Sequence, residues 1–244
     1  MLPKSFKSIF TFAAVAGGML ALSACSISGV GLKDGVPLSE LDMEGATPTK
    51  LQLAGPDTVT VTQGEALDID VSGSDDAVKG LRFRLEGNSL AIGRDSAWNG
   101  PGSATIAVTM PSLREISMAG SGKVTADSLT GKAEINVAGS GDISVARVAA
   151  TSLSVNIMGS GDVSASGRAD RLDYNVAGSG SLKARELQVG DAEINIAGSG
   201  DGVFASNGKV DGSVAGSGDV VVYGKARCSV KSVGSGTVRC RDAD

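Results

Sequence analysis

The sequence predicts an all-β protein, a single-stranded parallel β-helix with right-handed coiling and rungs of 18–20 residues. Three observations predict this solenoid. A Gly-Ser-Gly tripeptide recurs seven times, apolar and polar residues alternate around it, and glycine is abundant while aromatic residues are scarce. Glycine supplies 35 of 244 residues without a three-residue period, and aromatic residues make up 3%. These proportions exclude collagen and favour tight corners around an aliphatic core.

The tripeptide sets the length of the repeat. Its copies begin at residues 120, 139, 159, 178, 198, 216 and 234, so the spacings are 19, 20, 19, 20, 18 and 18. A unit this short buries an apolar side only by stacking on the next unit, at about 4.8 Å per rung. Connections between parallel strands are overwhelmingly right-handed, which predicts the sense of coiling.

Both glycines of each tripeptide are predicted to be structural corner residues. A sharp corner requires positive φ, and a stacked neighbour leaves no room for a Cβ. The corner glycines are Gly120, Gly122, Gly139, Gly141, Gly159, Gly161, Gly178, Gly180, Gly198, Gly200, Gly216, Gly218, Gly234 and Gly236.

The residues around each corner alternate with a period of two, which indicates strands with one buried side. Before the corner, aliphatic residues such as Ile135 and Val137 are separated by asparagine or serine. After the corner the alternation resumes, as at Ile143 and Val145. Each rung is therefore expected to contain two or three short strands and no helix.

The first 24 residues have the features of an export signal: two lysines, a short apolar stretch and small residues before a break. The tetrapeptide Leu22-Ser23-Ala24-Cys25 resembles the bacterial lipobox. This resemblance implies a lipoprotein signal peptide over 1–24 and lipidation of Cys25, with Ser26 favouring the outer membrane. Two or more acyl chains anchor a protein stably, so the membrane is an expected partner. In the alternative interpretation Cys25 is only a small apolar residue of the leader.

Two further segments precede the repeats. Residues 25–50 are rich in glycine, proline and acids and are interpreted as a tether. Residues 51–112 alternate like strands but lack Gly-Ser-Gly, so we expect irregular N-terminal rungs that cap the solenoid. Residues 113–244 are expected to form the regular β-helix.

Cys228 and Cys240 are expected to form a disulfide, because an exported chain meets an oxidising compartment. The bond would link residues 12 positions apart and contribute about 2–4 kcal/mol. Two buried free thiols are the alternative.

Four features together resemble the bacterial GIN domain, also called the autotransporter-adhesin head domain. They are Val59-Thr-Val-Thr-Gln-Gly64, Leu90-Ala-Ile92, Ala107-Val-Thr-Met-Pro111 and the repeated Val/Ile-Ala-Gly-Ser-Gly-Asp. The resemblance covers approximately Val59–Cys240. It implies a β-helical envelope protein, often a lipoprotein, with no established catalytic residues.

Composition argues against most enzyme classes. The chain has no histidine, the commonest general base and zinc ligand, so we expect no catalytic residue, no metal site and no cofactor. After removal of the leader, 20 Lys/Arg against 27 Asp/Glu give a net charge of −7. This acidity argues against a nucleic-acid partner.

Charged residues form rows along the predicted stack. The acidic rows are Asp142/Asp162, Asp201/Asp219, Glu115/Glu134 and Asp173/Glu193/Asp211. A basic row contains Arg147, Arg168, Arg185, Lys209 and Lys225. We interpret the acidic rows as a solvated polar face, with a weak cation site or a catalytic site as alternatives. The basic row either neutralises the acids or binds anionic glycans or lipid A.

The leading functional hypothesis is a lipid-anchored, non-enzymatic β-helix module of the cell envelope that adheres to, or binds, an envelope protein or glycan. One alternative is a self-assembling envelope scaffold, which an uncapped terminal rung would support. The other is a polysaccharide-active β-helix enzyme, which a deep groove would support.

Overall fold

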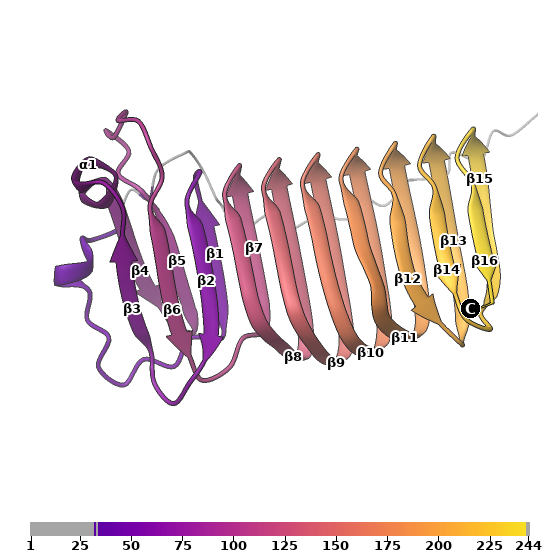
Figure 1. Cartoon of the computed structure of the whole chain (residues 1–244), viewed down its shortest axis with the longest axis horizontal. Helices are drawn as coiled ribbons and strands as arrows, with labels where there is room; N and C mark the ends of the chain where they lie inside the picture. The colour runs from indigo at the N-terminus through magenta and orange to yellow at the C-terminus, as the bar shows by residue number, and fades with distance from the viewer. Residues whose placement is uncertain (1–31, 33, 243–244) are drawn as a thin grey trace, which may run out of the picture.

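The rungs stack in parallel along one axis, with an irregular cap at the N-terminal end (Figure 1). The computed structural model describes residue 32 and residues 34–242, so the leader and Cys25 lie outside the described residues. The predicted all-β parallel β-helix is confirmed. Helical structure within the described residues consists of η1 (Leu38–Glu40) and α1 (Asp75–Lys79). In this part of the chain, no helix has the length and apolarity needed to cross a bilayer.

Four regular rungs each consist of one long, bent strand: β8 (Lys123–Gly139), β9 (Asp142–Gly159), β10 (Asp162–Gly178) and β11 (Ser181–Gly198). Two or three short strands per rung were expected. Pairing instead continues through each bend, where the register shifts locally, as between Ala165 and Gly167. The later strands are shorter: β12 (Gly202–Ser206), β13 (Lys209–Gly216), β14 (Val220–Tyr223), β15 (Arg227–Gly234) and β16 (Val238–Arg241).

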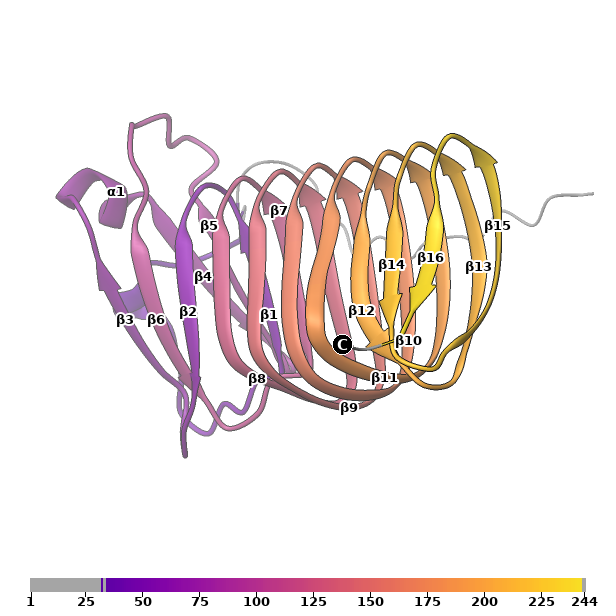
Figure 2. The same cartoon turned by 45° about the vertical axis from the view of Figure 1, so that its right-hand side comes forward.

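Each rung presents two broad outer faces, on opposite walls of the solenoid in Figure 2. The pre-corner face is the outer surface of the segments that lead into the corners. It contains β1 (Lys50–Ala54), β7 (Glu115–Gly120), the ends of β8–β11, β13 and β15. The post-corner face is the outer surface of the segments that follow the corners. It contains β2 (Thr58–Gln63), the starts of β8–β11, β12, β14 and β16.

The core is aliphatic and follows the predicted alternation. Ile135, Val155 and Ile194 are completely buried, and they occupy equivalent positions on different rungs. Asn156 and Asn195, which adjoin two of them along the chain, point outward. Burying one such aliphatic side chain contributes about 1.5–3 kcal/mol. Because every rung repeats this burial, the stack gains most of its stability from contacts between neighbouring rungs.

The two glycines of a corner are required for different reasons. Gly159 has φ of 128°, and a Cβ built on it would lie 2.3 Å from the Gly139 carbonyl oxygen. Gly161 does not have positive φ, yet its Cβ would lie 2.3 Å from the Gly141 carbonyl oxygen. Steric exclusion by the rung below therefore applies to both glycines, and positive φ applies only to the first.

The cap breaks the sequential order of the rungs. It contains β3 (Asp68–Ser72), β4 (Leu81–Glu86), β5 (Ser89–Arg94) and β6 (Thr105–Met110). β1 lies between β5 and β7, and β2 lies between β6 and β8, with parallel pairing on both sides. β3 and β4 are antiparallel additions that complete this end. Along the sequence, the β1–β2 rung therefore comes first, the strands at the end of the stack come next, and β7 and β8 then pair with the other side of the β1–β2 rung.

One corner in the cap has a different sequence. Ala54 and Ala119 are in register, so Gly55-Pro56-Asp57 occupies the place that Gly120-Ser121-Gly122 occupies on the next rung. Gly55 has φ of 134°, like the first glycine of the repeats. The stack therefore has a further corner whose sequence differs from Gly-Ser-Gly.

Part of the segment expected to be a tether packs on the cap. Val36 and Phe83 exchange two backbone hydrogen bonds of 2.8 Å, and Thr49 donates to the Asn88 carbonyl at 2.8 Å. Leu38, Leu41 and Met43 lie against the core. These aliphatic side chains cover the end of the stack, so residues 34–50 belong structurally to the cap.

At the C-terminal end, a covalent bond takes the place of a cap. Cys228 of β15 and Cys240 of β16 form a disulfide with a Cα–Cα distance of 6.6 Å. The bond links the pre-corner and post-corner walls of the last rung. β15 pairs only with β13, and β16 only with β14, among the described strands.

Candidate functional site

The pre-corner face carries a continuous ladder of side-chain hydrogen bonds. Asn156 donates to Asn136 at 2.9 Å, Asn175 to Asn156 at 3.0 Å, and Asn195 to Asn175 at 3.3 Å. Asn136 donates to Ser117 at 3.2 Å, and Ser213 donates to Asn195 at 3.3 Å. We call these six residues the amide ladder. Because each donor points towards the cap, the ladder holds the side chains in one repeated orientation across six rungs.

A column of small apolar residues runs beside the amide ladder, next to the corners. Its members in register are Ala54, Ala119, Ala138, Met158, Ala177, Ala197, Ala215 and Val233. Met158 and Val233 are the large members, and they are 53% and 74% exposed. The other six members are alanines, so a partner that approaches the amides away from Met158 and Val233 meets no bulky side chain in this column.

The acidic row on the other side of the ladder is neutralised by nearby cations. Arg171 bridges Asp173 and Glu193, with contacts of 2.9 and 2.8 Å. These carboxylates raise the pKa of Arg171 through hydrogen bonds and charge. Lys209 pairs with Asp211 at 2.5 Å, and Lys50 with Glu115 at 2.7 Å. The row is therefore a network of ion pairs on a polar face.

Aspartates on the post-corner face have a structural role that the sequence did not reveal. Asp162 accepts from the Ser181 backbone N–H at 3.2 Å, Asp201 from Asp219 at 2.8 Å, and Asp219 from Thr237 at 2.9 Å. Each carboxylate thus accepts a backbone donor of the following rung. Lys183 also contacts Asp162 at 2.5 Å, and this carboxylate raises the pKa of Lys183.

The ion pairs and hydrogen bonds of these carboxylates are relevant to the alternative that the acidic rows bind a cation. Within residues 34–242, no three or more acidic or cysteine side chains are grouped so as to hold a metal ion. Most carboxylates of the two faces contact lysine, arginine or backbone N–H groups, whereas Glu134 accepts from the Asn136 side chain at 3.0 Å. Their arrangement serves to join rungs.

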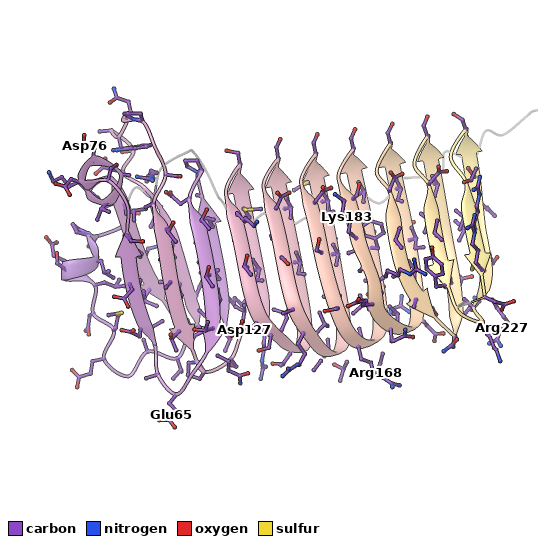
Figure 3. The ribbon with its side chains drawn as sticks, in the orientation of Figure 1. Glu65, Asp76, Asp127, Arg168, Lys183 and Arg227 are labelled. Carbon is purple, nitrogen blue, oxygen red and sulfur yellow. A yellow bond between two sulfur atoms is a disulfide. The ribbon has the colours of Figure 1, made fainter. Side chains whose placement is uncertain are left out.

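The basic row does not form a uniform stripe. Arg185 lies over the Tyr223 ring at 4.4 Å from its centroid, and Lys209 pairs with Asp211. Arg168 lies at the bend between the two faces (Figure 3). Arg147, Arg168 and Lys225 are exposed. The row therefore combines partnered cations with cations that face solvent.

The corner serines are held through their backbone. The Ser160 N–H donates to the Gly139 carbonyl at 2.8 Å, and the Gly161 N–H donates to the same oxygen at 3.1 Å. Along the serine row, the Ser217 and Ser235 hydroxyls lie 3.3 Å apart. Backbone bonds thus join one corner to the next.

The cap contains a shallow hollow of about 430 Å³ that the sequence did not predict. Trp98 forms part of its wall, with Asp76, Asp95, Lys79 and Arg82. Arg82 contacts Asp95 at 2.6 Å. The Ala97 backbone N–H, followed by Arg82, lowers the pKa of Asp95. A lone tryptophan in a loop offers no periodic signal from which such a hollow could be inferred.

A buried ion pair lies beneath this hollow. Asp57 is fully buried and receives a bidentate contact from Arg94, whose Nε lies 2.8 Å from a carboxylate oxygen. The Ala104 N–H also donates to Asp57 at 2.7 Å, and Arg94 donates to the Ala77 carbonyl. The Arg94 guanidinium lies 4.1 Å from the Trp98 ring centroid. These contacts tie the first corner to α1 and to the loop that follows β5.

Comparison with known proteins agrees with this architecture. A family model described as "Putative auto-transporter adhesin, head GIN domain" matches residues 47–226. The chain belongs to this family. Among curated proteins, none matches the sequence of this GIN-domain chain.

Solved structures resemble the GIN-domain chain over most of its length. A protein of Bacteroides fragilis described as a putative adhesin has a TM-score of 0.74 and 24% identity, covering 81% of this chain and 93% of its own. A protein of Parabacteroides distasonis described as a putative lipid binding protein has a TM-score of 0.62 and 24% identity, covering 82% and 94%. At these identities, the likeness establishes the shared fold.

Proposed function

We propose that this GIN-domain chain is a non-enzymatic, adhesin-like module of the cell envelope that binds an envelope protein or glycan through its pre-corner face. The amide ladder is the observation that carries this proposal. It presents fixed amide groups at the spacing of the rungs, about 4.8 Å. The adhesin description of the family supports the same class of function.

The chemistry of the face suits a polar, extended partner. An amide group both donates and accepts hydrogen bonds, so the ladder can match hydroxyl or peptide groups of a partner. The column of small apolar residues beside it lets apolar parts of the partner lie flat. Because the side chains are already ordered by their mutual hydrogen bonds, binding requires little further loss of side-chain entropy.

Anchoring through Cys25 completes the proposal. The lipobox-like Leu22-Ser23-Ala24-Cys25 supports lipidation, and Ser26 supports sorting to the outer membrane. Replacing Cys25 with Ala should release the protein from membranes, because the acyl chains provide the attachment. Fractionation and the mass of the N-terminal peptide measure this. An unmodified Cys25, or a variant retained in the membrane, would exclude the lipoprotein proposal.

The enzyme alternative receives no support from the hollow at Trp98. A general acid for glycoside cleavage needs a raised pKa, whereas the hydrogen bond from the Ala97 N–H, together with Arg82, lowers the pKa of Asp95. Trp98 packs against Arg94, and a Cβ on Gly80 would lie 2.3 Å from the indole. The loop thus has an evident structural role in closing the cap.

Charge substitution on the two faces tests the proposed binding surface. Asn156→Lys with Asn175→Lys places two cations in the ladder. Ser144→Lys with Ser164→Lys places two cations on neighbouring rungs of the post-corner face as a matched control, since each pair is in register. Binding is measured against envelope polysaccharides and immobilised envelope proteins. We expect the ladder variant to bind about tenfold more weakly, the loss of one good interaction, while the control binds normally. Thermal unfolding checks that both variants fold, and the ladder variant should lose about 1–2 kcal/mol of stability through its broken side-chain hydrogen bonds. Equal binding by all forms would remove the pre-corner face from consideration.

A further inference from the structure

The two ends of the solenoid expose strand edges of the same wall. On the post-corner side, β16 pairs only with β14 at the C-terminal end, and β3 pairs only with β6 at the cap, among the described strands. Figures 1 and 2 show the two strands at opposite ends of the stack. An unpaired edge presents backbone donors and acceptors to other chains and is normally blocked or covered. Each end thus carries one half of a possible strand pair.

The side chains of the two edge strands have matching inward positions. In β3, Ile69 is buried and Val71 packs on the core. In β16, Val238 packs on the core, and Cys240 is in register with the buried Val222. Both edges therefore place apolar side chains at alternate positions towards the interior.

The outward positions are complementary in charge. β3 exposes Asp68, Asp70 and Ser72, whereas β16 exposes Arg239 and Arg241 after Thr237. Within the described residues, the Asp68 and Asp70 side chains have no hydrogen-bond or ion-pair partner. Acidic Glu65 and Asp76 mark the cap end, and Arg227 marks the other end, in Figure 3.

The topology also fixes the direction in which these edges would pair. β3 is antiparallel to β6, and β6 runs parallel to β2 and to the rungs that lead to β16. When a second copy is stacked in the same sense, its β3 therefore runs antiparallel to β16. In one register, Asp68 lies opposite Arg241, Asp70 opposite Arg239 and Ser72 opposite Thr237. The same register places Ile69 opposite Cys240 and Val71 opposite Val238. In all five pairs the two side chains therefore point to the same side of the sheet, and they are apolar with apolar, acidic with basic, or hydroxyl with hydroxyl.

We propose that the chain associates head to tail, with β3 of one copy adding antiparallel to β16 of the next. Opposite charges directly across an antiparallel pair are favourable, and like charges are unfavourable. A contact between two C-terminal ends would instead place Arg239 and Arg241 against the same residues of the partner. The heterologous contact does not close, so it generates open chains of molecules. This association goes beyond the proposed binding of an envelope partner and does not depend on it.

The other wall contributes charge without strand addition. The edge of β4 is already occupied where Phe83 bridges Val36. The segment that covers this edge exposes Asp34, Glu40, Asp42 and Glu44, and the facing β15 exposes Arg227 and Lys231. On both walls, the acidic cap of one copy would thus face the basic terminal rung of the next copy. Since these charges are exposed, association should weaken as salt is raised.

Crosslinking tests the register directly. The double variant Ser72→Cys with Thr237→Cys keeps the four charged residues of the proposed contact. The exported variant is extracted in mild detergent and treated with a short bis-maleimide. A ladder of dimers, trimers and larger species is expected. The control pairs Ser72→Cys with Ser229→Cys, an exposed position on the β15 wall, and should give little crosslinked product. Equal products from both variants, or none from either, would overturn the proposal.

Charge reversal provides a second measurement that does not depend on crosslinking. Asp68→Arg with Asp70→Arg, and separately Arg239→Asp with Arg241→Asp, should each abolish association in sedimentation. Mixing the two variants should restore it, because each reversed end then meets an end of opposite charge. For the unmodified protein, the association constant should fall about tenfold or more between low and high salt. A protein that stays monomeric at high concentration and low salt, or a mixture that fails to associate, would overturn the proposal.

Discussion

The regular rungs β8–β11 and the cap obtain their order from different kinds of interaction. In the rungs, the same inward aliphatic positions, corner glycines and ladder bonds recur, so each contact has equivalents on neighbouring rungs. In the cap, a single buried pair, Asp57 and Arg94, joins a corner, a helix and a loop. Repetition thus distributes stability along the stack, whereas the cap concentrates it in a few residues without equivalents.

The largest effect is expected at the buried ion pair. Asp57→Ala leaves Arg94 without its carboxylate in a buried site, which should cost about 3–5 kcal/mol. Denaturant unfolding of the variant, followed by Trp98 fluorescence, measures the loss in the cap. Arg171→Ala removes an exposed ion-pair partner as a control and should cost about 0–1 kcal/mol. Similar losses for both variants would contradict the concentration of stability in the cap.

The second largest loss of stability is expected when an inward-pointing aliphatic side chain of a rung is truncated. Val155→Ala should cost about 2–4 kcal/mol through lost burial and the cavity that remains, while Asn156→Ala on the same strand should cost about 1 kcal/mol through lost ladder bonds. Thermal unfolding of the two variants provides the comparison. Equal shifts in melting temperature would contradict the assignment of faces.

Substitution of a corner glycine should destabilise the fold more than substitution of the serine between the two glycines. Gly159→Val places a side chain against the Gly139 carbonyl and forces positive φ on a β-branched residue, which should cost about 1–3 kcal/mol. Ser160→Ala at the same corner keeps the backbone bonds and should cost no more than about one hydrogen bond, ~1 kcal/mol. Unfolding curves for both variants test this order, and a harmless Gly159→Val would exclude the steric explanation of the corners.

The smallest effect concerns the acid dependence of the last rung. The Thr237 hydroxyl and backbone N–H donate to Asp219 and lower its pKa. A carboxyl group whose pKa is lower in the folded state than in the unfolded state stabilises the fold at pH values above its unfolded pKa. This stabilisation is lost as the pH falls through the folded-state pKa. Hydrogen exchange at the Thr237 amide should therefore lose protection in acid. Asp219→Asn should lose part of that protection at neutral pH and show less change on acidification. The same acid response in both proteins would exclude this role for Asp219.

Sequence periodicity predicted the rungs well because the information is local. The alternation around Ile135 and Val137 specifies which side is buried, and the glycine spacing specifies the length of a rung. The disulfide between Cys228 and Cys240 was also expected, and the structure contains it. These features depend on residues that are neighbours in sequence or one repeat apart.

The cap was less predictable because its pairing is not local. Nothing in β1 itself indicates that it lies between β5 and β7, and the corner Gly55-Pro56-Asp57 lacks the serine and second glycine of the repeat. α1 spans five residues, with Ser74 as its N-cap, and is too short to show helical periodicity. The partners of Asp57 and Trp98 likewise depend on tertiary placement. Site prediction from the sequence therefore succeeded for the repeated corners and missed the hollow, the buried pair and the free edges.

The insertion of β1 between β5 and β7 has a consequence for the order in which the molecule folds as it is synthesised. Lys50 pairs with Glu115, a residue 65 positions later, whereas successive rungs pair residues 18–20 positions apart. The first rung to be synthesised thus lacks one neighbour until the chain beyond β7 has followed. Contacts of such long sequence separation form slowly, since the intervening loop must close first. The cap is consequently expected to mature after the rungs that follow it have begun to stack, so the order of folding is partly reversed relative to the order of emergence.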